Sequence, residues 1–117
     1  MKLLTPFAFF FLSLLFFSAQ SDLRQASGKI TMLRVHDVGT KYGPPTDQID
    51  VEVVLQLSTQ VGKSFGFQLR NDSNALVHEG MLALLKDAYA NNWTVWIDYN
   101  IDPGKNNGVI IRAWVSR

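Results

Sequence analysis

The amino-acid sequence predicts a mostly β domain, with five short strands and one helix between the third and the fourth. Two patterns carry this prediction. Residues 49–57 alternate apolar and polar side chains, which is typical of a half-buried strand. Residues 78–90 instead repeat apolar side chains every three or four positions, as the buried face of an amphipathic helix does.

Residues 1–21 form a separate segment at the start of the chain. A single basic residue is followed by an apolar run over 3–17 and then by small and polar residues. This layout is typical of a secretory signal peptide, with Ala19 and Ser21 at the two positions that signal peptidase reads. We therefore expect a secreted or periplasmic protein with a single domain over residues 22–117.

The predicted domain is electrically neutral and has no cysteine. The eleven basic side chains of the chain include Lys2, and the other ten balance the ten acidic side chains. Neutrality argues against a general nucleic-acid binder and against attachment to an anionic membrane, because both need excess positive charge. The lack of cysteine excludes disulfides, thiol catalysis and thiolate metal sites. No second apolar run is long enough to span a membrane.

Three strands are expected before the helix, over residues 29–38, 49–57 and 64–69, with a polar lead-in at 22–28 and a glycine- and proline-rich loop at 39–48. In the second strand, the alternation places Asp50 and Glu52 on the solvent face. In the third, Phe65 and Phe67 are expected to point inward. Gly66 between them indicates a bend or a close approach of another backbone segment.

The second half of the domain contains the helix and two further strands. The helix is expected over residues 78–90, ending at Asn91-Asn92, with Met81, Leu82, Leu85, Ala88 and Tyr89 on its buried face. The strands are expected over 93–100 and 109–116, joined by a loop at 101–108, with Trp93, Val95, Ile97, Tyr99, Val109, Ile111, Ala113 and Val115 inward. This order of elements is that of the OB-fold, a five-stranded Greek-key barrel. A β-grasp fold is the alternative, although its usual order has one strand fewer.

The last two strands are expected to pair in one register that suits every opposed pair. The pairs include Tyr99 with Ile111 inward, and Asp98 with Arg112 and Trp96 with Trp114 outward. Two indoles outside a barrel usually mark a contact surface. We expect Trp96 and Trp114 to form a subunit interface in a homo-oligomer, or a platform on which a sugar stacks. The alternative is that the lead-in at 22–28 or the helix covers them.

No arrangement of residues in the sequence predicts catalysis, a metal site or a cofactor. His36 and His78 lie in separate predicted elements, whereas zinc normally requires three or four convergent ligands. The sequence contains no Gly-x-Ser-x-Gly elbow, phosphate-binding glycine loop or HExxH motif. We therefore expect a binding module rather than an enzyme.

One stretch of the sequence resembles a known family. A helix ending in Asp-Ala-Tyr-Ala-Asn-Asn is followed by Trp-Thr-Val-Trp-Ile-Asp-Tyr-Asn, a Gly/Asn loop and a closing strand. This run resembles the B subunits of AB5-type bacterial toxins, of the subtilase-cytotoxin-like and pertussis-like kinds. The resemblance implies an exported OB-fold that forms rings, binds cell-surface glycans and accompanies a separate catalytic subunit. Those subunits commonly hold a disulfide, which this chain cannot form.

The expected fold indicates where a ligand would bind. In OB-folds the ligand usually lies across strands two and three, between the loop that joins strands one and two and the loop that joins strands four and five. Tyr42, Lys63 and Asn106 fall in these places and are expected to contact a glycan or glycoprotein on a host surface. The alternatives are an exported inhibitor that uses the loop at 39–48 or 101–108 as a wedge, and a domain that binds single-stranded nucleic acid.

Overall fold

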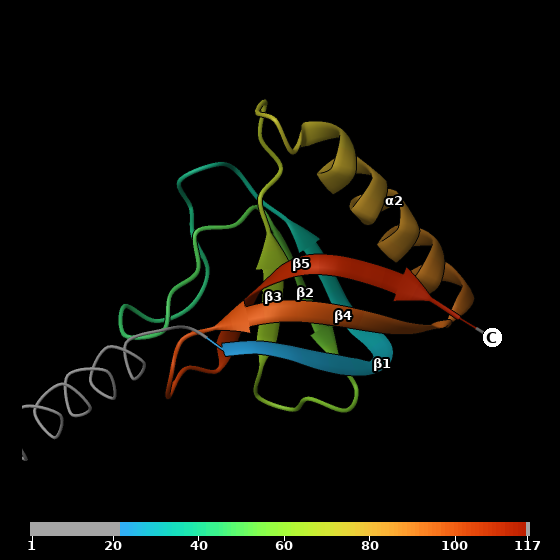
Figure 1. Cartoon of the computed structure of the whole chain (residues 1–117), viewed down its shortest axis with the longest axis horizontal. Helices are drawn as coiled ribbons and strands as arrows, with labels where there is room; N and C mark the ends of the chain where they lie inside the picture. The colour runs from blue at the N-terminus through green and yellow to red at the C-terminus, as the bar shows by residue number, and fades with distance from the viewer. Residues whose placement is uncertain (1–21, 117) are drawn as a thin grey trace, which may run out of the picture.

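The computed structural model describes residues 22–116, so the predicted signal peptide lies outside the described residues. Its elements are β1 (Asp22–Val35), β2 (Val53–Leu57), β3 (Ser64–Phe67), α2 (Ala75–Asn91), β4 (Thr94–Ile101) and β5 (Asn107–Val115) (Figure 1). The strands close into a barrel in the order β1-β2-β3-β5-β4, in which β3 and β5 are parallel and the other neighbours antiparallel. This confirms the predicted OB-fold, with the helix between strands three and four. No helix in residues 22–116 is long and apolar enough to cross a membrane.

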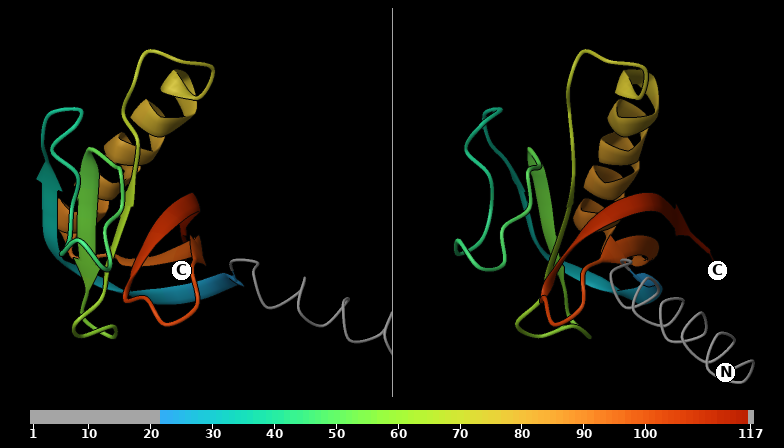
Figure 2. Two further views of the ribbon diagram at one scale, coloured as in Figure 1. Left: turned by 90° about the vertical axis from the view of Figure 1, so that its left-hand side faces the viewer. Right: turned by 60° about the vertical axis from the view of Figure 1, so that its left-hand side comes forward.

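The strand β1 is longer than predicted and is shared between two neighbours. Residues 22–29 pair with β4, and residues 30–35 pair with β2, with a register shift between Ile30 and Met32. Figure 2 shows the bend that carries β1 from one neighbour to the other. The prediction that the first strand begins at residue 29, after a polar lead-in at 22–28, was therefore wrong. The first four residues of β1 are exposed on both faces, so their sequence carries no apolar alternation.

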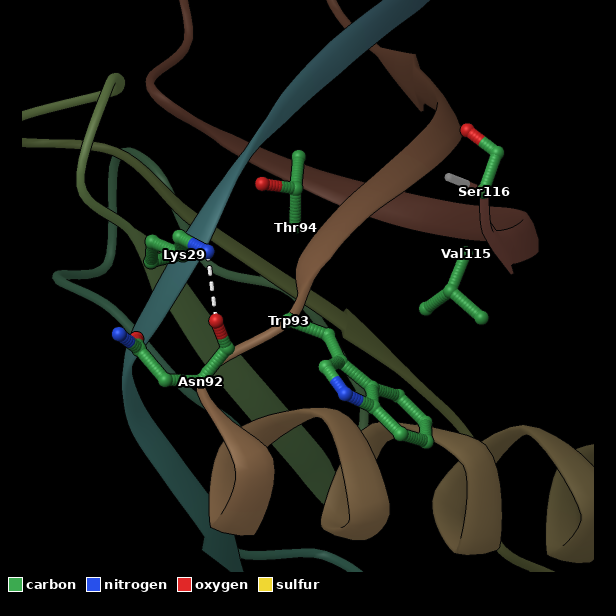
Figure 3. A pocket seen from close by; sticks show the side chains of 6 residues that line it. All are labelled: Lys29, Asn92, Trp93, Thr94, Val115 and Ser116. Atoms are coloured by element: carbon green, nitrogen blue, oxygen red, sulfur yellow. Dashed lines mark hydrogen bonds between the residues drawn. The ribbon is translucent and has the colours of Figure 1, made fainter.

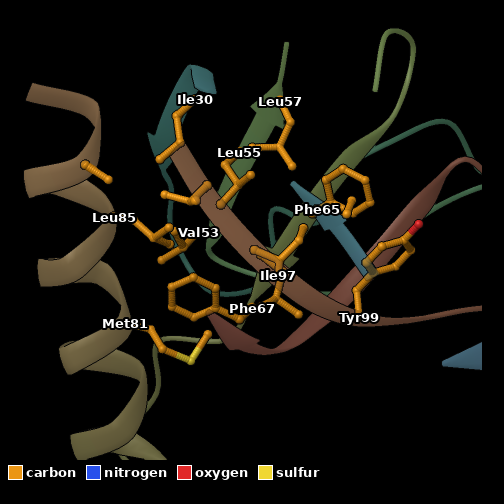
Figure 4. Close-up of a cluster of buried hydrophobic side chains, with 14 of the residues drawn as sticks. Ile30, Val53, Leu55, Leu57, Phe65, Phe67, Met81, Leu85, Ile97 and Tyr99 are labelled. Atoms are coloured by element: carbon orange, nitrogen blue, oxygen red, sulfur yellow. The ribbon is translucent and has the colours of Figure 1, made fainter. Parts of the chain in front are cut away.

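The core fills the barrel and the space between the barrel and α2. The side chains labelled in Figure 4 are Ile30, Val53, Leu55, Leu57, Phe65, Phe67, Met81, Leu85, Ile97 and Tyr99. Phe65 and Phe67 are fully buried, as predicted, and the ring centroids of Phe65 and Tyr99 lie 4.6 Å apart. Gly66 lies where two segments approach closely, because a Cβ at this position would stand 2.5 Å from the carbonyl oxygen of Val53.

The helix α2 begins three residues before its predicted start, at Ala75, and ends as expected. Asn92 adopts the left-handed conformation, with φ of 55°, and its backbone N–H bonds the last turn of the helix. Met81, Leu85 and Ala88 are buried. Tyr89 is 52% exposed, so its predicted place on the buried face was wrong. The face of α2 that packs on the barrel therefore contains fewer residues than the apolar stripe in the sequence.

The pairing of β4 with β5 follows the predicted register only in part. The predicted pairs of Asp98 with Arg112 and of Trp96 with Trp114 are present. A β-bulge then shifts the register, so that Tyr99 pairs with Ile110 instead of Ile111. Ile110 is 2% exposed and Ile111 is 42% exposed, because the extra residue of the bulge turns the side chains of β5 over.

Two other residues predicted to face inward are exposed. Val109 is exposed for the same reason as Ile111, because the bulge turns over the side chains of β5 that precede Arg112. Trp93 is 43% exposed, because it precedes β4 and lies at the end of the barrel rather than inside it. The inward prediction was therefore wrong for Trp93, Val109 and Ile111.

The residues before β2 also differ from the prediction. Glu52, expected on the solvent face, is buried and paired with Arg70, whereas Asp50 is exposed. Val54, from the polar phase of the alternation, is buried as well. The cause is a second, smaller apolar cluster outside the barrel, formed by Ile49, Val51 and Val54 with Met32 and Tyr42 packed against it. Because β2 is covered on both faces, its alternation does not separate core from solvent.

Candidate functional site

A groove runs over β2 and β3, on the face where OB-folds usually bind their ligands. It consists of two adjoining hollows of about 330 and 320 Å³, and Gln56 and Gly62 line both of them. The other lining residues of the first hollow are Tyr42, Gly43, Pro44, Asp47, Ser64, Asn106 and Asn107. The loops before β2 and after β4 therefore form two walls of the groove.

The structure brings the three residues predicted from the sequence to this groove. Tyr42 and Asn106 line the first hollow, although the chain between them includes most of the barrel. Lys63 lines the second hollow and directly precedes Ser64 of the first. Sequence reasoning missed Gln56 and Ser64, because both read as ordinary polar residues of a half-buried strand.

A chain of hydrogen bonds crosses the floor of the first hollow. Nε2 of Gln56 donates to Oγ of Ser64 at 3.0 Å, and Oγ of Ser64 donates to Oη of Tyr42 at 3.1 Å. Tyr42 therefore accepts from Ser64, and its own hydroxyl hydrogen is left to donate into the groove. The guanidinium of Arg34 lies 5.3 Å from the centroid of the Tyr42 ring and holds the ring by a cation–π contact. The chain thus presents to a ligand one phenol hydroxyl on a ring that is held in place.

The walls of the groove are joined by Asp47. Its carboxylate accepts the backbone N–H of Asn106 at 2.8 Å and that of Asn107 at 3.2 Å. The side chain of Asn107 donates to the carbonyl of Asp47 at 2.8 Å and accepts the N–H of Ser64 at 3.2 Å. Gly43 closes against the same place, since a Cβ there would lie 2.3 Å from the carbonyl oxygen of Asp47. The two loops are therefore fixed before any ligand arrives, which lowers the entropic cost of binding.

Most of the polar groups that line this groove are uncharged. Hydroxyl and amide groups line it, the carboxylate of Asp47 is occupied by backbone donors, and Lys63 supplies a positive charge in the second hollow. Within residues 22–116 there is no group of three or more histidine, cysteine, aspartate or glutamate side chains that could hold a metal ion.

The outer face of the barrel carries the two tryptophans singled out from the sequence. The rings of Trp96 and Trp114 stack with centroids 6.2 Å apart and planes 10° apart. Ser27 pairs with Trp96 on its other side, so residues 22–28 lie beside β4 in the same sheet, and both indoles are half-buried. The neighbouring pair, Asp98 and Arg112, forms an ion pair at 3.2 Å.

No protein-family model, curated protein or solved structure matches this chain. Function is therefore inferred from the groove and from the outer face of the barrel.

Proposed function

We propose that this protein is a secreted, non-catalytic OB-fold module that binds a glycan or glycoprotein on a cell surface through the groove over β2 and β3. The observation that carries the proposal is the hydrogen-bond chain that ends at the hydroxyl of Tyr42. A sugar offers hydroxyl, ring and glycosidic oxygens that accept from such a donor. The amide side chain of Asn106 and the ammonium of Lys63 add further donors along the same groove.

The fixed walls of the groove also support this ligand class. The hydroxyl groups of a sugar exchange their bonds to water for bonds to the protein, so protein groups that are already in position lower the cost of binding. Asp47 and Asn107 hold the loops by contacts that a ligand does not have to form. Lys63 is a single positive charge at the groove, which favours a neutral or weakly acidic ligand over the phosphate backbone of a nucleic acid.

A glycan array probed with purified residues 22–117 tests the proposal, with Tyr42→Phe as the variant. The variant keeps the ring and removes the donor. We expect the unchanged protein to retain a defined set of glycans, and Tyr42→Phe to bind them about three- to tenfold more weakly, as for one hydrogen bond of about 1 kcal/mol. Tyr89→Phe, at an exposed position on α2, is the matched control. Absence of any carbohydrate binding by the folded protein, or equal binding by both variants, would contradict the proposal.

We also propose that copies of the chain associate through the outer face that carries Trp96 and Trp114. The observation that favours this is a pair of stacked indoles on the outside of the barrel, since tryptophan is the residue most enriched at the centre of protein interfaces. The ion pair of Asp98 and Arg112 beside the indoles would then form the polar border of the contact.

A further inference from the structure

A third hollow, of about 460 Å³, lies at the end of the barrel beside the C-terminus of α2 and shares no lining residue with the groove. The six lining residues come from β1, from the end of α2 and from the two strands β4 and β5. They are Lys29, Asn92, Trp93, Thr94, Val115 and Ser116 (Figure 3). The middle of β1, the end of α2, the start of β4 and the end of β5 thus meet around one opening.

One wall of this hollow is apolar and is formed by Trp93 and Val115. Figure 3 shows the indole of Trp93 beside the methyl groups of Val115. Trp93 is 43% exposed, so a large part of its ring remains open to a ligand. A flat indole face favours the C–H face of a sugar ring or another ring of similar size, because these surfaces are apolar and complementary in shape.

The polar groups of the lining are one cation and two hydroxyl groups. The ammonium of Lys29 donates to the backbone carbonyl of Asn92, as the dashed line in Figure 3 marks. This bond fixes the long side chain and leaves two of its three N–H donors unassigned. The hydroxyl of Thr94 lines the hollow as well, and the hydroxyl of Ser116 lines it next to Val115 (Figure 3). The lining includes no acidic residue, and no carboxylate in residues 22–116 forms a salt bridge with Lys29.

The end of α2 does not cancel this positive charge. Backbone carbonyls at a helix C-terminus repel an anion when they point unpaired into a site. Here the carbonyl of Ala88 accepts the N–H of Trp93 at 2.9 Å, and the carbonyl of Asn92 accepts the ammonium of Lys29. These two carbonyl oxygens are thus already paired, and the ammonium of Lys29 is the one charged group among the lining residues.

We infer that this hollow is a second binding site, for a ring that carries a carboxylate, of the hexuronic acid class. The carboxylate lies against the ammonium of Lys29, the ring packs on Trp93, and the ring hydroxyls bond Thr94 and Ser116. This site is separate from the groove, so it can hold a ligand whether or not the proposed glycan site exists.

Titration of 15N-labelled residues 22–117 with D-glucuronate, followed by the indole N–H signals, tests the inference. Trp93→Phe assigns the Trp93 signal. We expect glucuronate to shift this signal at millimolar concentration, and D-glucose, which lacks the carboxylate, to bind at least about tenfold more weakly. Lys29→Met should weaken glucuronate binding by a similar factor, whereas Lys29→Arg should retain it. Lys86→Met is the matched control, because it removes an exposed lysine of α2 that lines neither the groove nor this hollow.

The outcomes separate this inference from the proposed function. Equal binding of glucose and glucuronate, or no shift of the Trp93 signal, would overturn it. Binding that survives Lys29→Met would overturn it as well. If Lys29→Met lowers the thermal midpoint, the comparison of Lys29→Arg with the unchanged protein still tests the role of the charge. Tyr42→Phe should leave the titration unchanged, so failure of the groove proposal and failure of this one give different results.

Discussion

The guanidinium of Arg70 donates two hydrogen bonds to the buried carboxylate of Glu52. Nε and Nη2 of Arg70 each donate to a different oxygen of Glu52 at 2.9 Å, and the Glu52 side chain is only 3% exposed. The backbone N–H of Leu69 donates to the same carboxylate at 3.0 Å. Arg70 also reaches the exposed Asp50 at 2.8 Å. Through these contacts, the residues that follow β3 are tied to the residues that precede β2.

Removing either member of this pair should destabilise the protein, but to different extents. Arg70→Ala leaves a buried carboxylate without its partner, whereas Glu52→Gln leaves Arg70 bound to Asp50 and partly solvated. We therefore expect the urea midpoint to fall more for Arg70→Ala than for Glu52→Gln. Arg112→Ala, which removes an exposed ion pair, is the control and should change the midpoint least. The reverse order of Arg70→Ala and Glu52→Gln would contradict this account.

The pair also predicts how stability depends on pH. The hydrogen bonds from Arg70 hold the pKa of Glu52 below its ordinary value of 4.5, although burial of the carboxyl opposes this. A carboxyl with a lowered pKa stabilises the folded state above its unfolded value, and this contribution is lost as the pH falls through the folded value. Urea midpoints measured between about pH 7 and pH 2 should therefore fall more steeply for the unchanged protein than for Glu52→Gln. Parallel curves would contradict the prediction.

Two glycines should respond to alanine in opposite directions. A Cβ at Gly66 would stand 2.5 Å from a backbone oxygen, so Gly66→Ala should lower the free energy of unfolding by about 1 to 3 kcal/mol. At Gly80, in the middle of α2, a Cβ would meet nothing within 4 Å. Gly80→Ala should raise the free energy of unfolding by about 0.5 to 1 kcal/mol, because alanine loses less backbone entropy in a helix. Chemical denaturation measures both changes, and a stabilising Gly66→Ala would be inconsistent with the structure.

Asp47→Ala should loosen the wall of the groove. The amides of Asn106 and Asn107 lose their acceptor, so their hydrogen exchange should become faster. The free energy of unfolding should fall by about 1 to 3 kcal/mol, as for hydrogen bonds to a charged acceptor. The control is Asp102→Ala, which removes an exposed carboxylate from the loop that contains Asn106. Unchanged exchange at Asn106 in Asp47→Ala would show that the loop is held by other contacts.

Trp114→Ala should weaken association between copies of the chain. Loss of a central tryptophan typically costs about 2 kcal/mol or more, which corresponds to a dissociation constant about 30-fold higher. Light scattering at micromolar concentration measures the mass of the unchanged protein and of the variant. Trp93→Ala removes an indole away from the stacked pair and should leave the mass unchanged. An unchanged protein that is already monomeric would remove the interface proposal.

The sequence was sufficient to predict the element order and half of the last hairpin. The register near Trp96 and Trp114 is predictable because it opposes Asp98 to Arg112 and the two indoles to each other. Directly before Arg112 stand two adjacent isoleucines, Ile110 and Ile111, and the sequence pattern allows either of them to face inward. Only the closure of the barrel decides that Ile110 does, because at Val109 the strand β5 pairs with β4 on one side and with β3 on the other. No local pattern carries that information.

The candidate groove shows the same limit. Tyr42 and Asn106 could be predicted because the fold class fixes which loops flank the binding face. The contacts that organise the groove depend on the parallel pairing of β3 with β5, which places Ser64 opposite Asn107. The burial of Glu52 depends in the same way on Arg70, which lies in a different segment of the chain. Each of these contacts joins residues that no periodicity relates.

The shared strand β1 has a consequence for the order in which the chain can fold. The barrel closes only when Asp22 meets Ile101, and nearly the whole domain lies between these residues in the sequence. The β2–β3 pair and α2 are built from local contacts and can form early, whereas closure has to await the synthesis of β4. A nascent chain that emerges from a ribosome therefore stays open until its last third is made. This delay would suit the secretion that we propose, because a chain that has not yet closed its barrel can be threaded through a narrow translocation channel.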